Sequence, residues 1–106
     1  MSLGYLEDQP TRDEIDAMEG PVALEFGADW CGICRGTRPE IDAALGSRPD
    51  ITHIKAADGS GVPLGRSFGI RLWPTVVLLQ DGTEVGRVVR PYSRTQIDEA
   101  IADAGL

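Results

Sequence analysis

The chain contains few of the residues that several classes of protein depend on. It holds two cysteines and one histidine among 106 residues, and aromatic residues make up 6% of the composition. Lys and Arg total 10 against 17 for Asp and Glu, which gives a formal net charge of −7 at pH 7. A protein this acidic repels a phosphate backbone and an anionic membrane surface. We therefore expect neither a nucleic acid nor a membrane as its partner.

Long hydrophobic runs and nucleotide-binding motifs are also absent. The longest purely apolar run, Val76 to Leu79, is far shorter than the ~20 residues of a membrane span. Met1 to Pro10 has neither a basic start nor an apolar core, so we expect no secretory signal peptide and a cytoplasmic location. The sequence contains no Gly-x-Gly-x-x-Gly and no Walker motif, and we expect no bound cofactor.

What is present predicts one α/β domain over residues 1–106. Hydrophobic residues make up 42% of the composition and charged residues 25%, as in ordinary globular domains. Capping-box patterns at 11–14 and 93–96 predict helix starts, and Asp81-Gly82 is a strong hairpin signal. In chain order we expect a helix at 13–19, a strand at 22–26, a helix from about 32 to 45, a strand at 51–57, a helix at 62–68, strands at 75–80 and 84–89, and a helix that opens at 93. Strands joined through helices imply parallel pairing, and the hairpin adds an antiparallel edge.

The two cysteines give the sharpest chemical signal in the chain. Cys31 and Cys34 are spaced Cys-Gly-Ile-Cys, at the point where a predicted strand is followed by a predicted helix. At a helix N-terminus, unpaired N–H groups and the helix dipole stabilise an anion, so the pKa of the first thiol should fall. Only a thiolate attacks a disulfide, and the second thiol, one turn later, can resolve the mixed disulfide that forms. The pattern therefore predicts a redox pair.

Two other uses of the cysteine pair stay open. A mononuclear zinc site would need further ligands, and His53 is the only histidine, so we expect no metal. A metal shared between two chains would escape this argument. A purely structural disulfide that closes so short a loop would add little stability. We interpret His53, on the second predicted strand, as a residue on a face of the sheet rather than a ligand.

Several segments of the chain together resemble thioredoxin. Residues 25–35, Glu-Phe-Gly-Ala-Asp-Trp-Cys-Gly-Ile-Cys-Arg, look like the active-site segment of that family. Pro39 falls where the family's active-site helix is kinked, and residues 69–75, Gly-Ile-Arg-Leu-Trp-Pro-Thr, look like the stretch that holds its cis-proline. The hairpin and the closing helix follow in thioredoxin order, so the resemblance runs from about Thr11 to the C-terminus. It implies the thioredoxin fold, a central mixed β-sheet flanked by helices on both faces.

The resemblance assigns catalytic roles to four residues. It implies that Cys31 is the attacking nucleophile, that Cys34 is the resolving thiol, and that Pro74 is cis and lies against the disulfide. Glu25 stands where the family has a buried acid, usually Asp, beneath the resolving cysteine, and it would accept and return the proton of Cys34. On the residues alone, Pro74 is equally compatible with a strand start. For Glu25 the residue type alone favours a solvated position, because Glu is rarely buried.

Further residues near the cysteines are expected to bind the substrate. Trp30 matches an aromatic that the family uses as a lid beside the sulfurs, and packing in the core is the alternative. Trp73 precedes Pro74, where the family more often has a smaller residue whose backbone pairs with an extended substrate segment. Arg90 lies where thioredoxin has a small glycine-containing loop. It could select an acidic partner and favour the thiolate, or keep a sheet edge from pairing.

Four other positions carry weaker expectations. Gly32 and Ile33 lie between the cysteines and are expected to contact the substrate, and Ile33 replaces the usual proline, which leaves the reduction potential open. Lys55 could match a lysine that family members place near the buried acid, or be a solvated lysine at a strand end. Asp29 is interpreted as a solvated acid of the loop.

The resemblance implies a thiol–disulfide oxidoreductase that reduces disulfides in other proteins. An electron donor such as a thioredoxin reductase would restore it. Ile33, Trp73 and Arg90 motivate an alternative, a more oxidising enzyme, an isomerase or a reductase dedicated to one partner. A binding or chaperone-like module without catalytic cysteines is the third hypothesis, which the intact cysteine pair and Pro74 disfavour.

Overall fold

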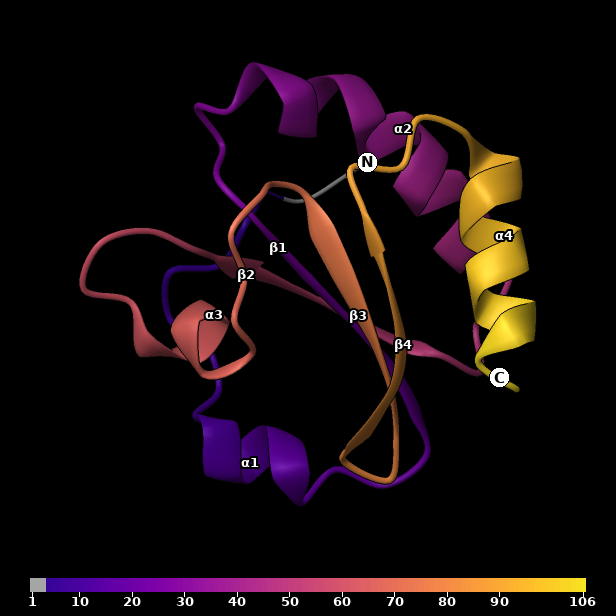
Figure 1. The fold of residues 1–106 in the computed structure, drawn as a ribbon, viewed down its shortest axis with the longest axis horizontal. Coiled ribbons are helices and arrows are strands. Elements are labelled where there is room, and N and C mark those ends of the chain that lie inside the picture. The colour runs from indigo at the N-terminus through magenta and orange to yellow at the C-terminus, as the bar shows by residue number, and fades with distance from the viewer. Residues whose placement is uncertain (1–3) are drawn as a thin grey trace.

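Two strands rich in apolar residues form the centre of a four-stranded mixed sheet. β1 (Pro21–Gly27) and β3 (Thr75–Gln80) are buried along almost their whole length, as strands covered on both faces must be. The strand order is β2-β1-β3-β4, with β2 (Thr52–Ala57) and β4 (Thr83–Val89) on the outside. β1 pairs parallel with β2 and antiparallel with β3, and β3 pairs antiparallel with β4. The computed structural model describes residues 4–106 (Figure 1).

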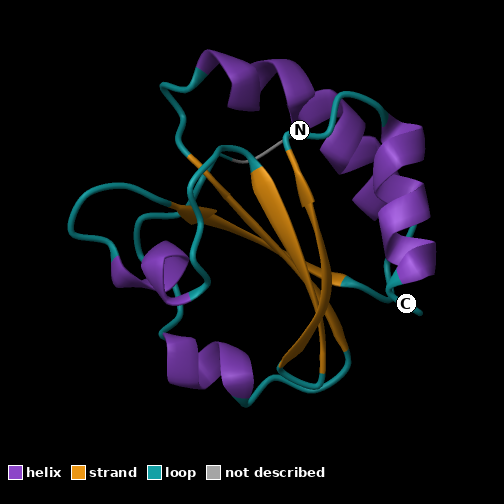
Figure 2. Cartoon of the chain, in the orientation of Figure 1, coloured by secondary structure: helices purple, strands orange, loops and turns teal. Residues whose placement is uncertain are grey.

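Helices cover both faces of this sheet (Figure 2). α2 (Gly32–Gly46) and α4 (Arg94–Asp103) lie on one face, and α1 (Arg12–Asp16) and α3 (Pro63–Ser67) lie on the other. Each face has its own apolar core. The first is built from Ala23, Ile41, Ala44, Leu45, Ile51, Val76, Leu78, Val88, Ile97 and Ile101, and the second from Ile15, Val22, Leu24, Phe26, Ala56, Leu64, Phe68, Val77 and Leu79. The predicted fold class is confirmed. Residues 1–3 of the predicted domain lie outside the described residues, so a single domain over 1–106 stays a prediction.

The first capping box forms as predicted, but its helix is shorter. The hydroxyl of Thr11 accepts the N–H of Glu14 at 3.1 Å, and the Glu14 carboxylate accepts the N–H of Thr11 at 3.1 Å. We expected this helix to reach residue 19, whereas it ends at Asp16. The following residues form the turn into β1, in which Gly20 has φ +78° and donates its N–H to Asp81. A left-handed backbone of this kind cannot continue a right-handed helix.

The second capping box is only half formed. The hydroxyl of Ser93 accepts the N–H of Gln96 at 3.2 Å and caps α4 as predicted. The Gln96 side chain does not return to Ser93, because its oxygen accepts the N–H of Tyr92 at 3.1 Å instead. The predicted start of this helix is therefore confirmed, but the side chain of Gln96 bonds to the residue before Ser93 and not to Ser93 itself.

The segment before the first helix fastens to the sheet, although no element was predicted there. The N–H of Leu6 donates to the carbonyl of Lys55, and the N–H of Ala57 donates to the carbonyl of Leu6, both at 2.9 Å. This single parallel bridge beside β2 carries Tyr5 into the interior, where it is 5% exposed. No helix within residues 4–106 is long and apolar enough to cross a membrane.

Candidate active site

The cysteine pair lies at the start of α2, just after the end of β1, as the sequence predicted. Cys31 is the N-cap residue of α2, and its sulfur accepts the N–H of Cys34 at 3.2 Å. Cys31 is 9% exposed, whereas Cys34 is 0% exposed beneath it. Both thiols are free. One sulfur can therefore reach a substrate, and the other can be reached only through the first.

The surroundings shift the pKa values of the two thiols in opposite directions. Burial of the Cys31 sulfur opposes its ionisation. Hydrogen bonds from the Cys34 thiol and from the N–H groups of Cys34 and Ile33, together with the charge of Arg90, outweigh that burial and lower the pKa of Cys31. Burial, a hydrogen bond to Cys31 and the negative charge that Cys31 develops raise the pKa of Cys34 to about 11. The exposed thiol is thus prepared to attack, and the buried one to stay protonated until a base removes its proton.

The loop that faces the cysteines contains the predicted cis-proline. The Trp73–Pro74 peptide bond is cis. Arg90, just after β4, donates its N–H to the carbonyl of Pro74 at 2.8 Å and its Nε–H to the carbonyl of Trp73 at 2.9 Å. The charge of Arg90 contributes to the lowered pKa of Cys31, and Arg90 also follows an outer strand, so both interpretations of this residue stay predictions.

Two tryptophans flank the cysteine pair. The rings of Trp30 and Trp73 meet edge to face with centroids 5.4 Å apart. Trp30 is 74% exposed, so the alternative that it packs in the core is wrong. Trp73 packs against the buried cluster that holds both cysteines, and its indole N–H donates to Asp58 at 2.9 Å. Ile33 is exposed between the cysteines, so the surface around Cys31 is largely apolar.

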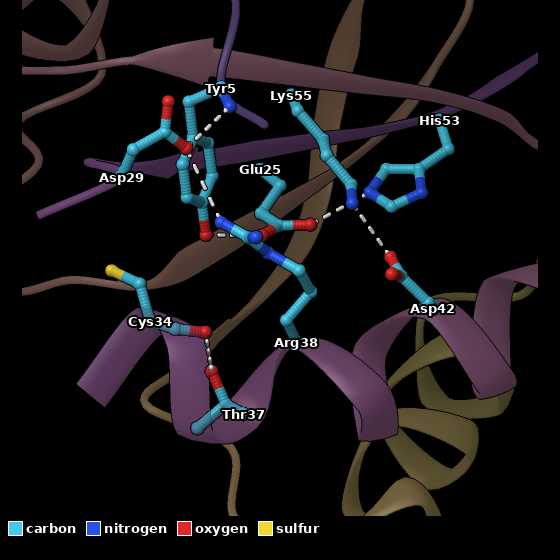
Figure 3. Close-up of polar contacts among 9 residues, drawn as sticks. All are labelled: Tyr5, Glu25, Asp29, Cys34, Thr37, Arg38, Asp42, His53 and Lys55. Atoms are coloured by element: carbon cyan, nitrogen blue, oxygen red, sulfur yellow. Dashed lines mark hydrogen bonds and ion pairs between the residues drawn. The ribbon is translucent and has the colours of Figure 1, made fainter. Parts of the chain in front are cut away.

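Glu25 is fully buried, as the resemblance implied and contrary to what the residue type alone suggests. It lies on the face of β1 that α2 covers, and both of its oxygens have partners. The Tyr5 hydroxyl donates to Oε2, and Nε2 of His53 lies 2.8 Å from Oε1. The Tyr5 hydroxyl, and not Cys34, is the hydrogen-bond partner on the side of the carboxylate that faces the resolving thiol (Figure 3). Partners at both oxygens lower the cost of burying the group.

More charged side chains surround this carboxylate. Lys55 is the register partner of Glu25 on β2, and its ammonium lies 2.9 Å from Asp42 on α2, with a side chain only 11% exposed. Lys55 is therefore near the buried acid and not a solvated residue. Asp29 is exposed as expected, yet it accepts the N–H of Tyr5 at 3.0 Å and pairs with Arg38 at 3.3 Å.

One acidic cluster has metal-ligand chemistry. Ligand atoms of Glu25, Asp42 and His53 lie within 4.8 Å of one another, and no other such group occurs among residues 4–106. The Lys55 ammonium already supplies a positive charge at Asp42. We therefore describe the cluster as a hydrogen-bonded network and not as a metal centre.

A family model described as thioredoxin matches residues 3–103. The chain belongs to the thioredoxin family. The thioredoxin of Porphyra purpurea is 26% identical over 102 residues, which are 95% of this chain and 95% of that protein. The thioredoxin of Chlamydia muridarum (strain MoPn / Nigg) is 34% identical over 70 residues, 66% of this chain and 69% of that protein. Reduced thioredoxin 2 from Pseudomonas aeruginosa PAO1 superposes with a TM-score of 0.87 at 45% identity, covering 99% of this chain and 98% of that one.

These findings confirm the predicted family, fold and chemistry. The chain is a thiol–disulfide oxidoreductase, as thioredoxins are. Nothing in the fold or the comparisons favours a non-catalytic module. The site also contains two residues that the sequence reasoning did not assign to it, Tyr5 and His53.

His53 could have been found from the sequence, whereas Tyr5 could not. Side chains alternate along a strand, so His53 shares a face with Lys55, which was already considered near the buried acid. Tyr5 precedes every predicted element, and no periodicity or cap places it. Its position depends on the bridge between Leu6 and β2.

Proposed function

We propose that this oxidoreductase reduces disulfides in other proteins through Cys31 and Cys34. The observation that carries the proposal is the opposite shift of the two thiol pKa values at the N-terminus of α2. A lowered pKa on the accessible thiol favours attack on a substrate, and a raised pKa on the buried thiol keeps a proton there until the second step.

The reaction then proceeds in two exchanges. The Cys31 thiolate attacks one sulfur of the substrate disulfide, which forms a mixed disulfide and releases the other substrate sulfur as a thiolate. Cys34 loses its proton and attacks the Cys31 sulfur, which forms the Cys31–Cys34 disulfide and releases the second substrate thiolate. Both substrate thiolates take up protons, so the substrate gains two electrons and two protons. Glu25 is the base that receives the Cys34 proton and later returns it.

The substrate segment is proposed to lie along the cis-proline loop, between the two tryptophans and Ile33. The N-terminal turn of α2 at Gly32 gives it access to Cys31, and Pro74 holds the loop opposite the sulfur. The carbonyl of Trp73 accepts the Nε–H of Arg90 and keeps a second lone pair, so an extended segment either pairs at that lone pair or displaces the Arg90 side chain. Arg90 then remains available to an acidic group of the substrate.

A thioredoxin reductase is the electron donor that we propose. The Cys31–Cys34 disulfide must be reduced after each turnover, and no nicotinamide or flavin motif occurs in this sequence. A cytoplasmic location is proposed with it, because that compartment keeps thiols reduced. Catalytic amounts of a thioredoxin reductase with NADPH should then sustain reduction of insulin by the protein.

The reduction potential tests the direction of the reaction. A value near the roughly −270 mV of thioredoxin, measured by Trp fluorescence across a dithiothreitol series, supports a general reductase. A value above about −200 mV overturns that direction and indicates an oxidant or isomerase. Insulin reduction should vanish in Cys31→Ser, and Cys34→Ser should accumulate the mixed disulfide. Thr83→Ala, at the exposed start of β4 and therefore at the opposite end of the sheet from the sulfurs, serves as the control.

A further inference from the structure

The Tyr5 hydroxyl lies between the resolving thiol and the buried acid. It donates to Oε2 of Glu25, and it lies close enough to the Cys34 thiol to lower the pKa of that thiol. Tyr5 packs in one buried cluster with both cysteines. Figure 3 shows the Cys34 sulfur and the Glu25 carboxylate on either side of this hydroxyl. The Tyr5 oxygen therefore lies between the Glu25 carboxylate and the Cys34 sulfur, and a hydroxyl can both donate and accept a hydrogen bond.

Gly27 makes room for this arrangement. An added Cβ at residue 27 would stand 2.7 Å from the Tyr5 hydroxyl oxygen and 2.9 Å from the Cys34 sulfur. The two atoms therefore converge on the same point of β1, in the space that a side chain would otherwise fill.

We propose that the Tyr5 hydroxyl relays the proton from the Cys34 thiol to the Glu25 carboxylate when Cys34 resolves the mixed disulfide. The inference rests on the proposed function and adds a residue to it. As the Cys34 S–H bond breaks, its proton bonds to the Tyr5 oxygen, and the original hydroxyl proton passes to Oε2 of Glu25. Tyr5 stays neutral, Glu25 becomes a carboxylic acid, and the Cys34 thiolate attacks Cys31. The reverse transfer returns the proton to Cys34 after reduction.

The surroundings of Tyr5 favour relay over ionisation of the phenol. Burial, followed by the charge of Glu25 and the hydrogen bond to it, raises the pKa of Tyr5 far above its ordinary value. The phenol therefore does not ionise. The proton that arrives from Cys34 and the proton that leaves for Glu25 must move in one step. The cation near the ring, Arg38, has its guanidinium carbon 5.7 Å from the ring centroid and is paired with Asp29.

The other carboxylate oxygen of Glu25, Oε1, is also held in place. His53 contacts Oε1 at 2.8 Å and directs Oε2 toward Tyr5, and the Lys55–Asp42 ion pair lies beside it. When Glu25 is ionised it only accepts, so the hydrogen of that contact lies on Nε2 of His53. The resolving thiol is thus connected through Tyr5 and Glu25 to a histidine that is partly exposed at the edge of the sheet.

A stopped-flow experiment with Tyr5→Phe tests the relay. Reduced protein is mixed with one equivalent of dithiobis(nitrobenzoate), an aromatic disulfide whose thiolate products are coloured and need no proton. The first release reports attack by Cys31, and the second reports resolution by Cys34. We expect the second phase of Tyr5→Phe to slow at least about tenfold at neutral pH, with the first phase changed less than about twofold.

The pH profile separates a relay from a packing effect. As the pH rises toward the pKa of Cys34 in the mixed disulfide, which lies below that of the free dithiol because Cys31 is then neutral and bonded, hydroxide removes the proton directly, so the gap between Tyr5→Phe and the unchanged protein should close. A constant gap at every pH would mean that Tyr5 only positions the site, and an unchanged second phase would mean that water carries the proton. Either result overturns the proposal. Tyr92→Phe makes the same chemical change at an 83% exposed residue and should leave both phases unaltered.

A second variant keeps the test independent of how well Tyr5→Phe folds. Glu25→Gln retains the shape and a partner for Tyr5 but cannot accept the proton, so it should show the same slowed phase and the same pH profile. The double variant should be no slower than the slower single variant, because both groups act in one relay. Additive slowing would contradict the relay. If the unchanged protein releases only one coloured equivalent, the dithiol function fails and the relay with it.

Discussion

Gly27→Ala should destabilise the protein, although the same change usually stabilises a strand. An alanine Cβ at this position would lie 2.5 Å from Cζ of Tyr5 and 2.9 Å from the sulfur of Cys34. Gly27 ends β1, where it pairs with Ala57 of β2 and its carbonyl accepts the N–H of Asp58 at 2.8 Å, so the backbone there cannot easily move away. The Tyr5 ring, held only by the short segment before α1, must give way instead.

The expected loss of stability follows from the cheaper of two responses, expulsion of the Tyr5 ring or a shift of the ring within its site. Expelling a buried tyrosine of about 150–250 Å² would cost about 4–6 kcal/mol as an upper bound. Shifting the ring within an overpacked site costs about 1–3 kcal/mol, so the shift is what we expect. Replacing glycine removes freedom from the unfolded chain and offsets about 0.4–1 kcal/mol of this. The net loss in the free energy of unfolding is then at most about 2.6 kcal/mol, with a midpoint of about 1.3 kcal/mol.

Urea unfolding monitored by Trp fluorescence measures this loss, with Gly36→Ala as the matched control. Gly36 lies inside α2, and an added Cβ there meets nothing within 4 Å. That control should gain about 0.5–1 kcal/mol, because alanine favours a helix over glycine. A Gly27→Ala protein as stable as the unchanged one, with its resolution step intact, would refute the crowded geometry at Tyr5.

Two further predictions concern the thiols. The free energy of unfolding should fall by up to about 1.4 kcal/mol per pH unit between pH 9 and about 10, because the unfolded chain loses the Cys34 proton in this window while the folded chain keeps it. Urea titrations at a series of pH values measure the slope, and Cys34→Ser should flatten it there, below the pH at which the raised pKa of Tyr5 adds a slope of the same sign. Arg90→Gln should raise the pKa of Cys31, seen as a shift of the ultraviolet thiolate absorbance, because a positive charge that lowers it is removed. Arg94→Gln, whose arginine pairs with Asp98 on α4, should leave that pKa in place.

The fold was largely predictable because its signals are local. Thr11, Ser93 and the Asp81-Gly82 turn set helix starts and a hairpin through their own hydrogen bonds and backbone geometry. The end of α1 was not predictable in the same way, since the carbonyl of its last residue, Asp16, lies against Gly82 of the distant hairpin. Boundaries set by such distant partners have no signature in a short window.

The buried acid shows where residue type and family resemblance disagree. Glu is rarely buried, so composition favoured a solvated Glu25. The structure buries it because partners from two separate segments meet both oxygens, His53 on β2 and Tyr5 before α1. Neither partner is adjacent in sequence, so only the resemblance could indicate burial, and it could not indicate that a tyrosine stands between Glu25 and Cys34.

The two cysteines also control when the buried proton leaves. Burial raises the pKa of Cys34, and so do its hydrogen bond to Cys31 and the charge on that sulfur. Once Cys31 has attacked a substrate, its sulfur is neutral and bonded, and the second and third of these effects disappear. The neighbouring Tyr5 hydroxyl acts in the opposite direction and lowers the pKa of Cys34. The thiol is therefore held protonated while Cys31 needs its hydrogen bond, and it becomes easier to ionise at the step that requires its thiolate. Attack by one sulfur thus prepares the other, without any movement of the backbone.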